Sequence, residues 1–413
     1  MTAPIFTLEP EKGGIPGKFI VVLKEKYDVQ KHLESLSQEN NKNLDVGGGY
    51  MHLKPYDRIR GYHAQLTGPA LDTLSQKTDI EYIFQDRRGE LDGQPEDGTQ
   101  VDAIVPDEDT SPWHLGRICR SGPLPPGADP LLMNYDYRTE HLPEASNRPV
   151  NVYVLDTGIM SEHDQFPEGR VILGPNYTGL TDDDVVGHGT HVAGIIGGKD
   201  VGVATSGNVL IFAVKVIGGE NSLGSTITGM EWAIAHAESV AKTAQVASII
   251  NMSLRFPPVN NINDPLELLV AEAVSSNIHV VVSAGNRNDL ATSQIPARAP
   301  QALAVGASNI ADERWEGSNY GPKVGIFAPG VTIMSAGIAS PTALVAMTGT
   351  SMAAPVVSGI IAYLIQKEGN MSPEAMIARL LKLAAGGVGL STTSLPPDTT
   401  KLLVHNGFPR FRD

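Results

Sequence analysis

The sequence predicts an α/β protein with a doubly wound parallel sheet, preceded by a small α+β domain. Three observations lead to this prediction. Apolar, strand-like runs alternate with helix-like segments through most of the chain. A shorter group of elements lies before them, and an acidic stretch rich in Pro and Gly separates the two groups. We therefore divide the chain into a domain at 1–90, a linker at 91–111 and a domain at 112–413.

The N-terminal elements follow the order strand, helix, strand, helix, strand. "KFIVVL" is rich in β-branched residues, and Leu33 and Leu36 give the segment after it helical spacing. The predicted strands are 18–23, 62–68 and 80–86, and the predicted helices are 29–40 and 69–79. This order is typical of a split βαβ, ferredoxin-like arrangement, an open sheet with helices on one face. The composition of 87–112 then predicts an exposed linker.

The C-terminal part alternates between strands and helices. The predicted strands are 150–156, 208–217, 246–254 and 279–286, the predicted helices are 191–198, 225–242 and 264–277, and apolar runs follow at 301–309 and 324–330. Such alternation favours parallel strands with helices on both faces of the sheet. In these sheets functional groups gather at the carboxyl ends of the strands.

The composition predicts a folded, acidic protein. Of the 413 residues, 41% are hydrophobic and 19% are charged, which allows a sizeable core and argues against global disorder. With 46 acidic and 31 basic residues, the formal net charge is -15. A nucleic-acid partner is not expected, because it needs a basic face. A membrane partner is not expected either, because no apolar run reaches the length of a membrane span.

The N-terminus and the single cysteine bear on the compartment. "MTAPIFTLEPEKGGIPGKFIVVL" lacks a basic segment followed by an apolar run of about 7–15 residues, the pattern of a signal peptide. As it stands, the N-terminus predicts an intracellular protein, whereas a longer precursor with a leader would be secreted. Cys119 is the only cysteine, so no intrachain disulfide can form, and we expect an inert structural thiol.

Polar residues stand at the ends of several predicted elements. Asp156 ends the apolar run of "VNVYVLD", and Asn286 ends that of "HVVVSAGN". "GHGTHVAG" has His188 and His191 at a predicted helix start, and Ser351 in "GTSMAAP" precedes another apolar run. Taken singly, the Asp and the Asn are ordinary turn residues and the Ser is an ordinary helix cap. The two histidines lack a third metal ligand, so we interpret His188 as reactive and His191 as packed in the helix.

Taken together, these motifs carry a resemblance. "DTG", "GHGTHVAG", "AGN" and "GTSMAAP" occur in this order, and the set closely resembles the subtilisin-like serine proteases over roughly 112–390. "SPWHLGRI", "PARAPQALAVGASN" and "SNYGPKVGIFAPG" are similar to the fungal, proteinase-K-like branch. Residues 18–86, ending in "IEYIFQD", resemble the inhibitor-type propeptide that precedes such enzymes.

The resemblance implies a serine endopeptidase made as a self-inhibited zymogen. It implies that Ser351 is the nucleophile, that His188 moves the proton and that Asp156 orients His188. Asn286 and the Ser351 backbone N–H are implied to bind the oxyanion. The implied substrate-binding residues are Ser253, Leu254, Arg255, Phe256, Ser283, Ala284 and Gly285. The implied partners are a polypeptide substrate and the chain's own propeptide, with a processing site within 90–112.

Three features depart from the family pattern. Arg255 and Phe256 in "NMSLRF" replace glycines of the strand that pairs with substrate, and either narrow the pockets or point to solvent. An Arg there could also favour acidic side chains. Gly325 stands where relatives often carry a calcium-binding Asp, so no cofactor is expected and calcium is doubtful. The run "TDDD" (181–184) is interpreted as a solvated loop rather than a replacement site.

Two alternatives stay open. The first is a catalytically silent relative that acts as a binding or regulatory protein, which the altered "SLRF" strand favours and the complete motif set opposes. The second keeps the chemistry but applies it to one precursor peptide, as a dedicated processing protease. Reaction with a fluorophosphonate distinguishes an enzyme from a silent relative.

Overall fold

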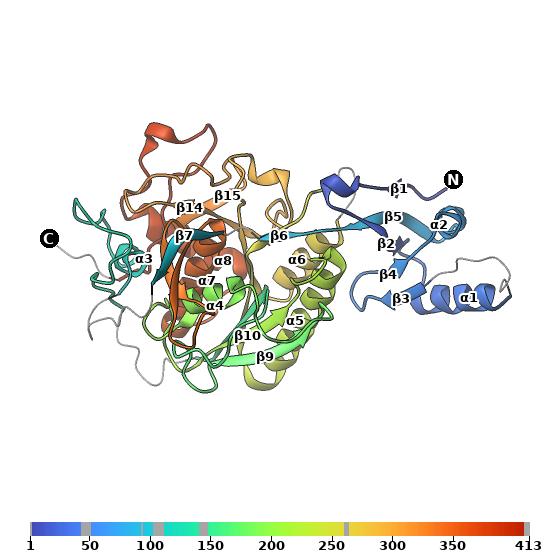
Figure 1. Cartoon of the computed structure of the whole chain (residues 1–413), viewed down its shortest axis with the longest axis horizontal. Coiled ribbons are helices and arrows are strands. Elements are labelled where there is room, and N and C mark those ends of the chain that lie inside the picture. Colours follow the sequence, from blue (N-terminus) through green and yellow to red (C-terminus); the bar gives the residue numbers. More distant parts are fainter. Residues whose placement is uncertain are drawn as a thin grey trace.

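A seven-stranded sheet forms the centre of the larger domain (Figure 1). The computed structural model describes residues 2–42, 51–91, 94–101, 111–139, 148–259 and 264–408. In spatial order the strands are β15 (Val324–Pro329), β14 (Leu303–Ser308), β13 (His279–Ser283), β11 (Ala247–Met252), β8 (Val150–Asp156), β10 (Val209–Lys215) and β9 (Val171–Asn176). All neighbouring strands run parallel. The strand β8 lies inside the sheet, with β10 and β9 on one side of it and β11, β13, β14 and β15 in chain order on the other. This arrangement confirms the predicted doubly wound sheet.

Helices cover both faces of this sheet. The helices α4 (His188–Gly197) and α7 (Thr350–Glu368) pack together on one face, and α5 (Leu223–Ala244) and α6 (Pro265–Ser275) pack together on the other. Alternate strand residues face opposite sides. Val154 of β8 therefore lies in the core under α4 and α7, whereas Leu155 lies in the core under α5 and α6. Burial on both sides explains why β8 reads as a continuous apolar run.

Further elements complete the larger domain. They are the helices α3 (Trp113–Ile118) and α8 (Pro373–Ala385), the strands β16 (Ile333–Ala336) and β17 (Leu344–Thr348), and 3₁₀ turns at Ala291–Ser293 and Thr392–Ser394. The strands β16 and β17 pair antiparallel, and β17 leads directly into α7. The sequence analysis predicts neither of these strands, nor β9 at the sheet edge.

The N-terminal domain is a five-stranded sheet with two helices. Its strands, in spatial order, are β1 (Ile5–Phe6), β5 (Ile80–Arg87), β2 (Gly14–Leu23), β4 (Gly61–Gln65) and β3 (Met51–Pro55), the helices are α1 (Val29–Lys42) and α2 (Gly68–Ser75), and a 3₁₀ turn lies at Pro10–Lys12. From β2 to β5 the chain has the order β-α-β-β-α-β, which adds the strand β3 to the five elements predicted. Val21 belongs to the core with α1 and α2. Val22 faces the other way, into the core that contains residues of α5 and α6.

The segment after β5 joins the larger domain through its backbone. The strand β6 (Glu90–Leu91) pairs with β12 (Leu254–Arg255), and β7 (Gln94–Val101) pairs with β17. Figure 1 shows β6 and β7 extending from the N-terminal domain across the larger one. The predicted linker at 91–111 thus contains strand residues, because main-chain hydrogen bonds need no particular side chains. Its residues 92–93 and 102–110 lie outside the described residues.

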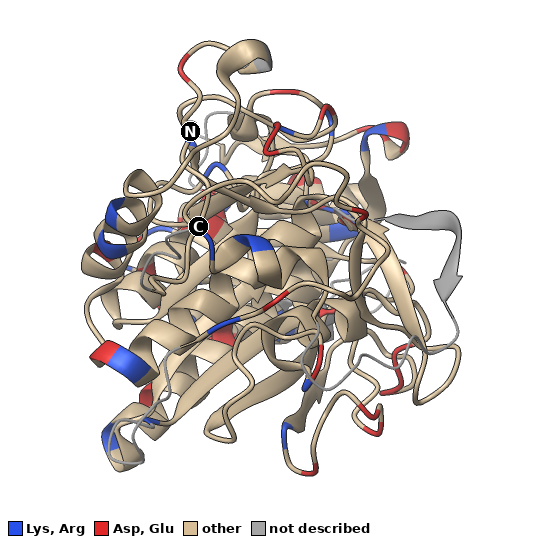
Figure 2. Cartoon of the chain, turned by 90° about the vertical axis from the view of Figure 1, so that its left-hand side faces the viewer, with Lys and Arg blue, Asp and Glu red and all other residues tan. Residues whose placement is uncertain are grey.

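Charged residues are mixed over the surface. Figure 2 shows acidic and basic residues interspersed on the loops and helix ends of the face that carries the C-terminus. Within the described part of the chain, no helix has the length and apolar character needed to cross a membrane.

Candidate active site

The carboxyl end of β8 brings Asp156 against His188, the first residue of α4. His188 Nδ1 lies 2.8 Å from Asp156 Oδ1 and 3.0 Å from Oδ2, and both residues are buried. A carboxylate can only accept, so Nδ1 carries the proton and Nε2 of the neutral ring is an acceptor. Gly189 allows α4 to lie close to the turn after β8, because a Cβ at this position would lie 2.2 Å from the Gly158 carbonyl oxygen.

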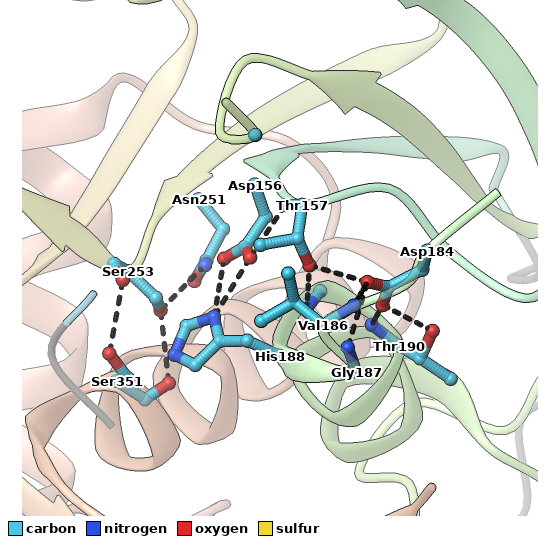
Figure 3. Close-up of polar contacts among 12 residues, drawn as sticks. Asp156, Thr157, Asp184, Val186, Gly187, His188, Thr190, Asn251, Ser253 and Ser351 are labelled. Carbon is cyan, nitrogen blue, oxygen red and sulfur yellow. Dashed lines mark hydrogen bonds and ion pairs between the residues drawn. The ribbon is translucent and has the colours of Figure 1, made fainter. Parts of the chain in front are cut away.

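Ser351 lies in the first turn of α7, on the other side of the imidazole. Figure 3 shows the His188 ring between the Asp156 carboxylate and the Ser351 side chain. Ser351 Oγ donates to the Ser253 carbonyl oxygen over 3.0 Å, and Ser253 Oγ donates to the Ser351 carbonyl oxygen over 2.9 Å. Asn251 Nδ2 donates to Ser253 Oγ over 3.1 Å.

Asn286 follows β13 and has a fixed side-chain orientation. Its Oδ1 accepts from the Thr350 backbone N–H over 2.9 Å and from Thr350 Oγ1 over 2.7 Å. Since the amide oxygen is held there, the Nδ2 group is turned to the opposite side, as a donor. Thr350 Oγ1 also accepts from the Gly285 N–H over 3.0 Å. Sequence reasoning missed Thr350, although its hydroxyl directly precedes Ser351.

The chain's own residues lie against the strand beside Ser351. In the antiparallel pair of β6 and β12, Leu91 is opposite Leu254 and Glu90 is opposite Arg255. The Gly89 N–H donates to the Asn221 carbonyl oxygen over 2.7 Å. On the other side of Ser351, Gln94 is opposite Thr348, the last residue of β17. Residues 90–91 and 94–101 thus pair with β12, which follows Ser253, and with β17, which leads into α7.

The arrangement of Asp156, His188, Ser351 and Asn286 indicates a serine protease, and similarity to known proteins identifies the family. The profile of the subtilase family matches residues 147–407, which include Asp156, His188, Asn286 and Ser351. The chain belongs to this family. Alkaline protease 1 of Emericella nidulans is 35% identical over 97% of this chain and 94% of that protein. The subtilisin-like serine protease Pen ch 18 of Penicillium rubens is 33% identical over 98% and 83%.

A solved structure agrees with the family assignment. The crystal structure of a cold adapted subtilisin-like serine proteinase superposes with a TM-score of 0.59 and 31% identity, and covers 72% of this chain and 98% of that one. The predicted fungal subtilisin-like family and the subtilisin-like fold are thereby confirmed. This subtilase is a serine-type endopeptidase, a hydrolase.

Asp184 braces the start of α4 in this subtilase (Figure 3). Its carboxylate accepts from Thr157 Oγ1 over 2.8 Å, from the Gly187 N–H over 2.8 Å and from Thr190 Oγ1 over 2.7 Å. Acceptors at a helix N-terminus satisfy N–H groups that have no partner within the helix. The interpretation of 181–184 as a solvated loop is therefore wrong for Asp184, which is only 6% exposed. The sequence signal was a carboxylate four residues before His188.

The side chains of Arg255 and Phe256 both contact other residues of the subtilase rather than pointing to solvent. The Arg255 side chain is 11% exposed and forms an ion pair with Glu90. Phe256 is fully buried, and its backbone exchanges hydrogen bonds with Ile295 over 2.9 and 3.1 Å. The alternative that both side chains point to solvent is thus wrong. A backbone bridge at Phe256 holds the ring against Gly89, where a Cβ would lie 2.5 Å from Phe256 Cε1.

The remaining candidates beside the cleft have roles within the fold. Ser283 ends β13 and is buried, and the Ala284 N–H donates to the Val305 carbonyl oxygen over 3.0 Å. Gly285 has a φ of +105°, and a Cβ there would lie 2.3 Å from Gln294 Oε1. These residues lead the chain from β13, which lies beside β12, to Asn286. Their backbone positions therefore set where Asn286 stands.

His191 and Cys119 are buried structural residues. His191 Nε2 donates to the carbonyl oxygens of Ile333 and Val345 over 2.9 and 3.0 Å. Burial lowers the pKa of His191 to about 3, so its ring is neutral at physiological pH. Burial raises the pKa of the Cys119 thiol, whose Sγ lies 3.3 Å from the Gly116 carbonyl oxygen. Both agree with the sequence interpretation of packed, unreactive side chains.

Removal of calcium is expected to change the melting temperature of this subtilase by no more than about 2 °C, because only a bound ligand stabilises the folded state. Calcium prefers six to eight oxygen ligands, several of them carboxylates. Gly325 supplies no side chain, Asp183 accepts from Thr181 Oγ1 over 2.8 Å, and Asp182 accepts from Asn176 Nδ2 over 3.0 Å. Thermal unfolding with excess chelator and with excess calcium tests this. A shift of many degrees would contradict it.

Proposed function

We propose that this subtilase is an Asp-His-Ser endopeptidase that cleaves its own chain between Leu91 and Gln94 and is inhibited by the N-terminal part until that part leaves. The observation that carries the proposal is the pairing of the chain's own backbone on both sides of Ser351. Glu90 and Leu91 pair with β12 before it, and Gln94 pairs with Thr348 after it. We assign the cut to one of the three peptide bonds between Leu91 and Gln94, because the paired segments end at these two residues.

In the proposed reaction Ser351 Oγ attacks the carbonyl carbon of the scissile bond while His188 Nε2 takes its proton. Asp156, at 2.8 Å from Nδ1, stabilises the imidazolium that forms. The carbonyl oxygen becomes an oxyanion, which accepts from Asn286 Nδ2 and from the Ser351 N–H. His188 then gives its proton to the leaving amine, and an acyl-enzyme forms. Water, deprotonated by His188, releases the acid and restores Ser351.

The position of Ser351 at a helix start further stabilises the oxyanion. It lies in the first turn of the 19-residue helix α7, where the helix dipole contributes partial positive charge. The oxyanion therefore develops beside a helix N-terminus and two N–H donors. The charge develops in the transition state, so these groups stabilise that state more than the bound substrate.

The N-terminal domain contacts the protease domain through a polar interface as well as an apolar core. Glu231 of α5 accepts from the backbone N–H groups of Asp57, Arg58 and Ile59 over 3.2, 2.8 and 3.2 Å. Burial raises the pKa of Glu231, although these N–H groups act in the opposite direction. Arg58 forms ion pairs of 2.7 Å with Glu238 and 2.5 Å with Glu272. This interface supports the proposed role of residues 1–91 as a bound inhibitor.

Arg58→Ala is expected to weaken the binding of the N-terminal domain by about tenfold, since it removes two partly exposed ion pairs. In the full-length chain, the lag between self-cleavage and the appearance of activity should shorten. Gel analysis of cleavage and a peptide assay measure the two events. Arg60→Ala is the matched control, because Arg60 is exposed and pairs only loosely, at 3.6 Å, with Glu25 of its own domain. Equal lags in both variants would contradict the inhibitor role.

The experiment that tests the proposed function is labelling with a fluorophosphonate, followed by peptide mapping. The expected product is a single adduct on Ser351 after self-cleavage, together with a new N-terminus at residue 92, 93 or 94. The silent-relative alternative predicts no adduct and an intact chain. An adduct with a cut outside Leu91–Gln94 would retain the enzyme and refute the proposed cleavage segment.

A further inference from the structure

We propose that Arg255 and Arg287 form a subsite for an acidic side chain of the substrate, and that Phe256 requires glycine at the residue before it. The inference rests on the proposed function, because it takes residues 89–91 as an example of a bound substrate. It names the substrate class of the protease as polypeptides that carry glycine, an acidic residue and an apolar residue in succession.

Glu90 lies between two guanidinium groups of the protease domain. Arg255, opposite Glu90 in the strand pair, forms an ion pair with its carboxylate. Arg287 Nη2 lies 2.9 Å from Glu90 Oε1 and 3.1 Å from Oε2. The two arginines come from different elements, one from β12 and one from the turn after β13. A carboxylate that bridges two guanidinium groups has charge-assisted hydrogen bonds, which are stronger and more directional than neutral ones.

Both arginines follow residues close to the reaction centre, although the Arg287 side chain is 57% exposed. Arg287 directly follows Asn286, and its backbone N–H donates to Asn319 Oδ1 over 3.0 Å. Arg255 is the second residue after Ser253, which exchanges two hydrogen bonds with Ser351. The acidic side chain is therefore recognised at one defined distance from Ser351. When residues 1–91 leave, Glu90 leaves with them, and the two neighbouring positive charges favour a new anion.

The Phe256 ring occupies the space beside the residue before the acid. Gly89 lies between the Asn221 carbonyl oxygen, which its N–H contacts over 2.7 Å, and the Phe256 ring. A Cβ on residue 89 would lie 2.5 Å from Cε1 and 2.7 Å from Cζ. With residues 1–91 bound, the ring is fully buried in a core that it shares with α5 and α6, so its movement is restricted. Steric exclusion thus selects glycine at this position without adding a contact.

The residue after the acid completes the pattern. Leu91 is opposite Leu254 and packs against the same core as Phe256. Side chains alternate along an extended strand, so Glu90 points away from the side on which residues 89 and 91 lie. The protease thus selects for small size at position 89, for negative charge at position 90 and for an apolar side chain at position 91.

The test uses the self-processed protein and peptides that correspond to residues 86–97. With the natural peptide as reference, Glu90→Gln in the peptide should lower kcat/KM about tenfold, because a partly exposed charge-assisted pair is lost. The Arg255→Gln, Arg287→Gln double variant should discriminate the two peptides by less than about twofold, and the preference should weaken at high salt. Gly89→Ala in the peptide should also lower kcat/KM with the unaltered protease.

Arg379→Gln is the matched control for the double variant. Arg379 pairs with Glu368 at the far end of α7, which at 1.5 Å per residue lies about 25 Å along the helix from Ser351. It should keep the full preference for Glu. A peptide library adds an internal check: the distance in residues from the preferred acid to the cut bond must equal that from Glu90 to the self-cleavage bond.

Each outcome bears on one of the two ideas. Equal cleavage of the Glu and Gln peptides by the unaltered protease overturns the acidic subsite and leaves the endopeptidase intact. A preference that persists in the double variant also overturns it. If no peptide is cut and no fluorophosphonate adduct forms, the proposed function and this inference both fail.

Discussion

Ser351→Ala is expected to leave a chain that folds, stays uncut at Leu91–Gln94 and hydrolyses peptides about 10⁶-fold more slowly, the size of loss known for the nucleophile of subtilisin itself. The physical reason is that Ala has no oxygen to attack the carbonyl carbon. The oxyanion donors of Asn286 and the helix remain, so a small residual rate over water is expected. Turnover of a peptide substrate and mass analysis of the intact chain measure the two effects.

The control separates chemistry from folding. Ser372→Ala removes a hydroxyl that caps α8, where its oxygen accepts from the Ala375 N–H over 3.3 Å. It should cost about 1 kcal/mol of stability and no activity. A Ser351→Ala chain that still cuts itself in purified form would assign the nucleophile elsewhere.

Asn286→Ala is expected to reduce kcat by about 10²–10³ with little change in KM, as for the oxyanion-binding Asn of subtilisin. The donor is needed only when negative charge develops, so the loss falls on the transition state rather than on binding. Thr350→Val should produce a smaller loss of the same kind, because Thr350 holds Asn286 Oδ1 through two hydrogen bonds of 2.9 and 2.7 Å.

Asn309→Ala is the matched control for Asn286. Its Oδ1 also accepts from two backbone N–H groups, those of Ala311 and Glu313, each over 3.0 Å, but both belong to the turn after β14 and not to α7. The turnover of the Asn309→Ala variant should equal that of the unaltered protease. If Asn286→Ala raised KM and left kcat unchanged, Asn286 would be a substrate-binding residue and not an oxyanion donor.

The fold could be predicted where burial leaves a strong pattern. The strand β8 is buried on both faces, and its run of apolar residues marks it within one residue. The edge strand β9 was missed, because it is partly exposed and contains Gly174 and Pro175. The strands β16 and β17 are short, and their pairing depends on contacts that sequence periodicity does not record.

The site divides in the same way. The motifs around Asp156, His188 and Ser351 are local, and their order along the chain identifies the family. Thr350 and Asp184 act through hydrogen bonds that include partners distant in the sequence, such as Asn286 for Thr350 and Thr157 for Asp184. The pairing of Arg255 with Glu90 joins residues 165 positions apart. The amino-acid composition of the segment after β5 does not predict this ion pair.

The apolar face of the N-terminal sheet has a consequence for the lifetime of the inhibitor. Val22, Tyr82 and Phe84 lie in a core that is completed by α5 and α6. If the domain leaves as proposed, these side chains enter water, and a domain of about 90 residues with part of its apolar core uncovered is only marginally stable. Transient unfolding then exposes its backbone to the very protease that it inhibited. On this proposal the released N-terminal domain is degraded and cannot bind again, so activation is irreversible.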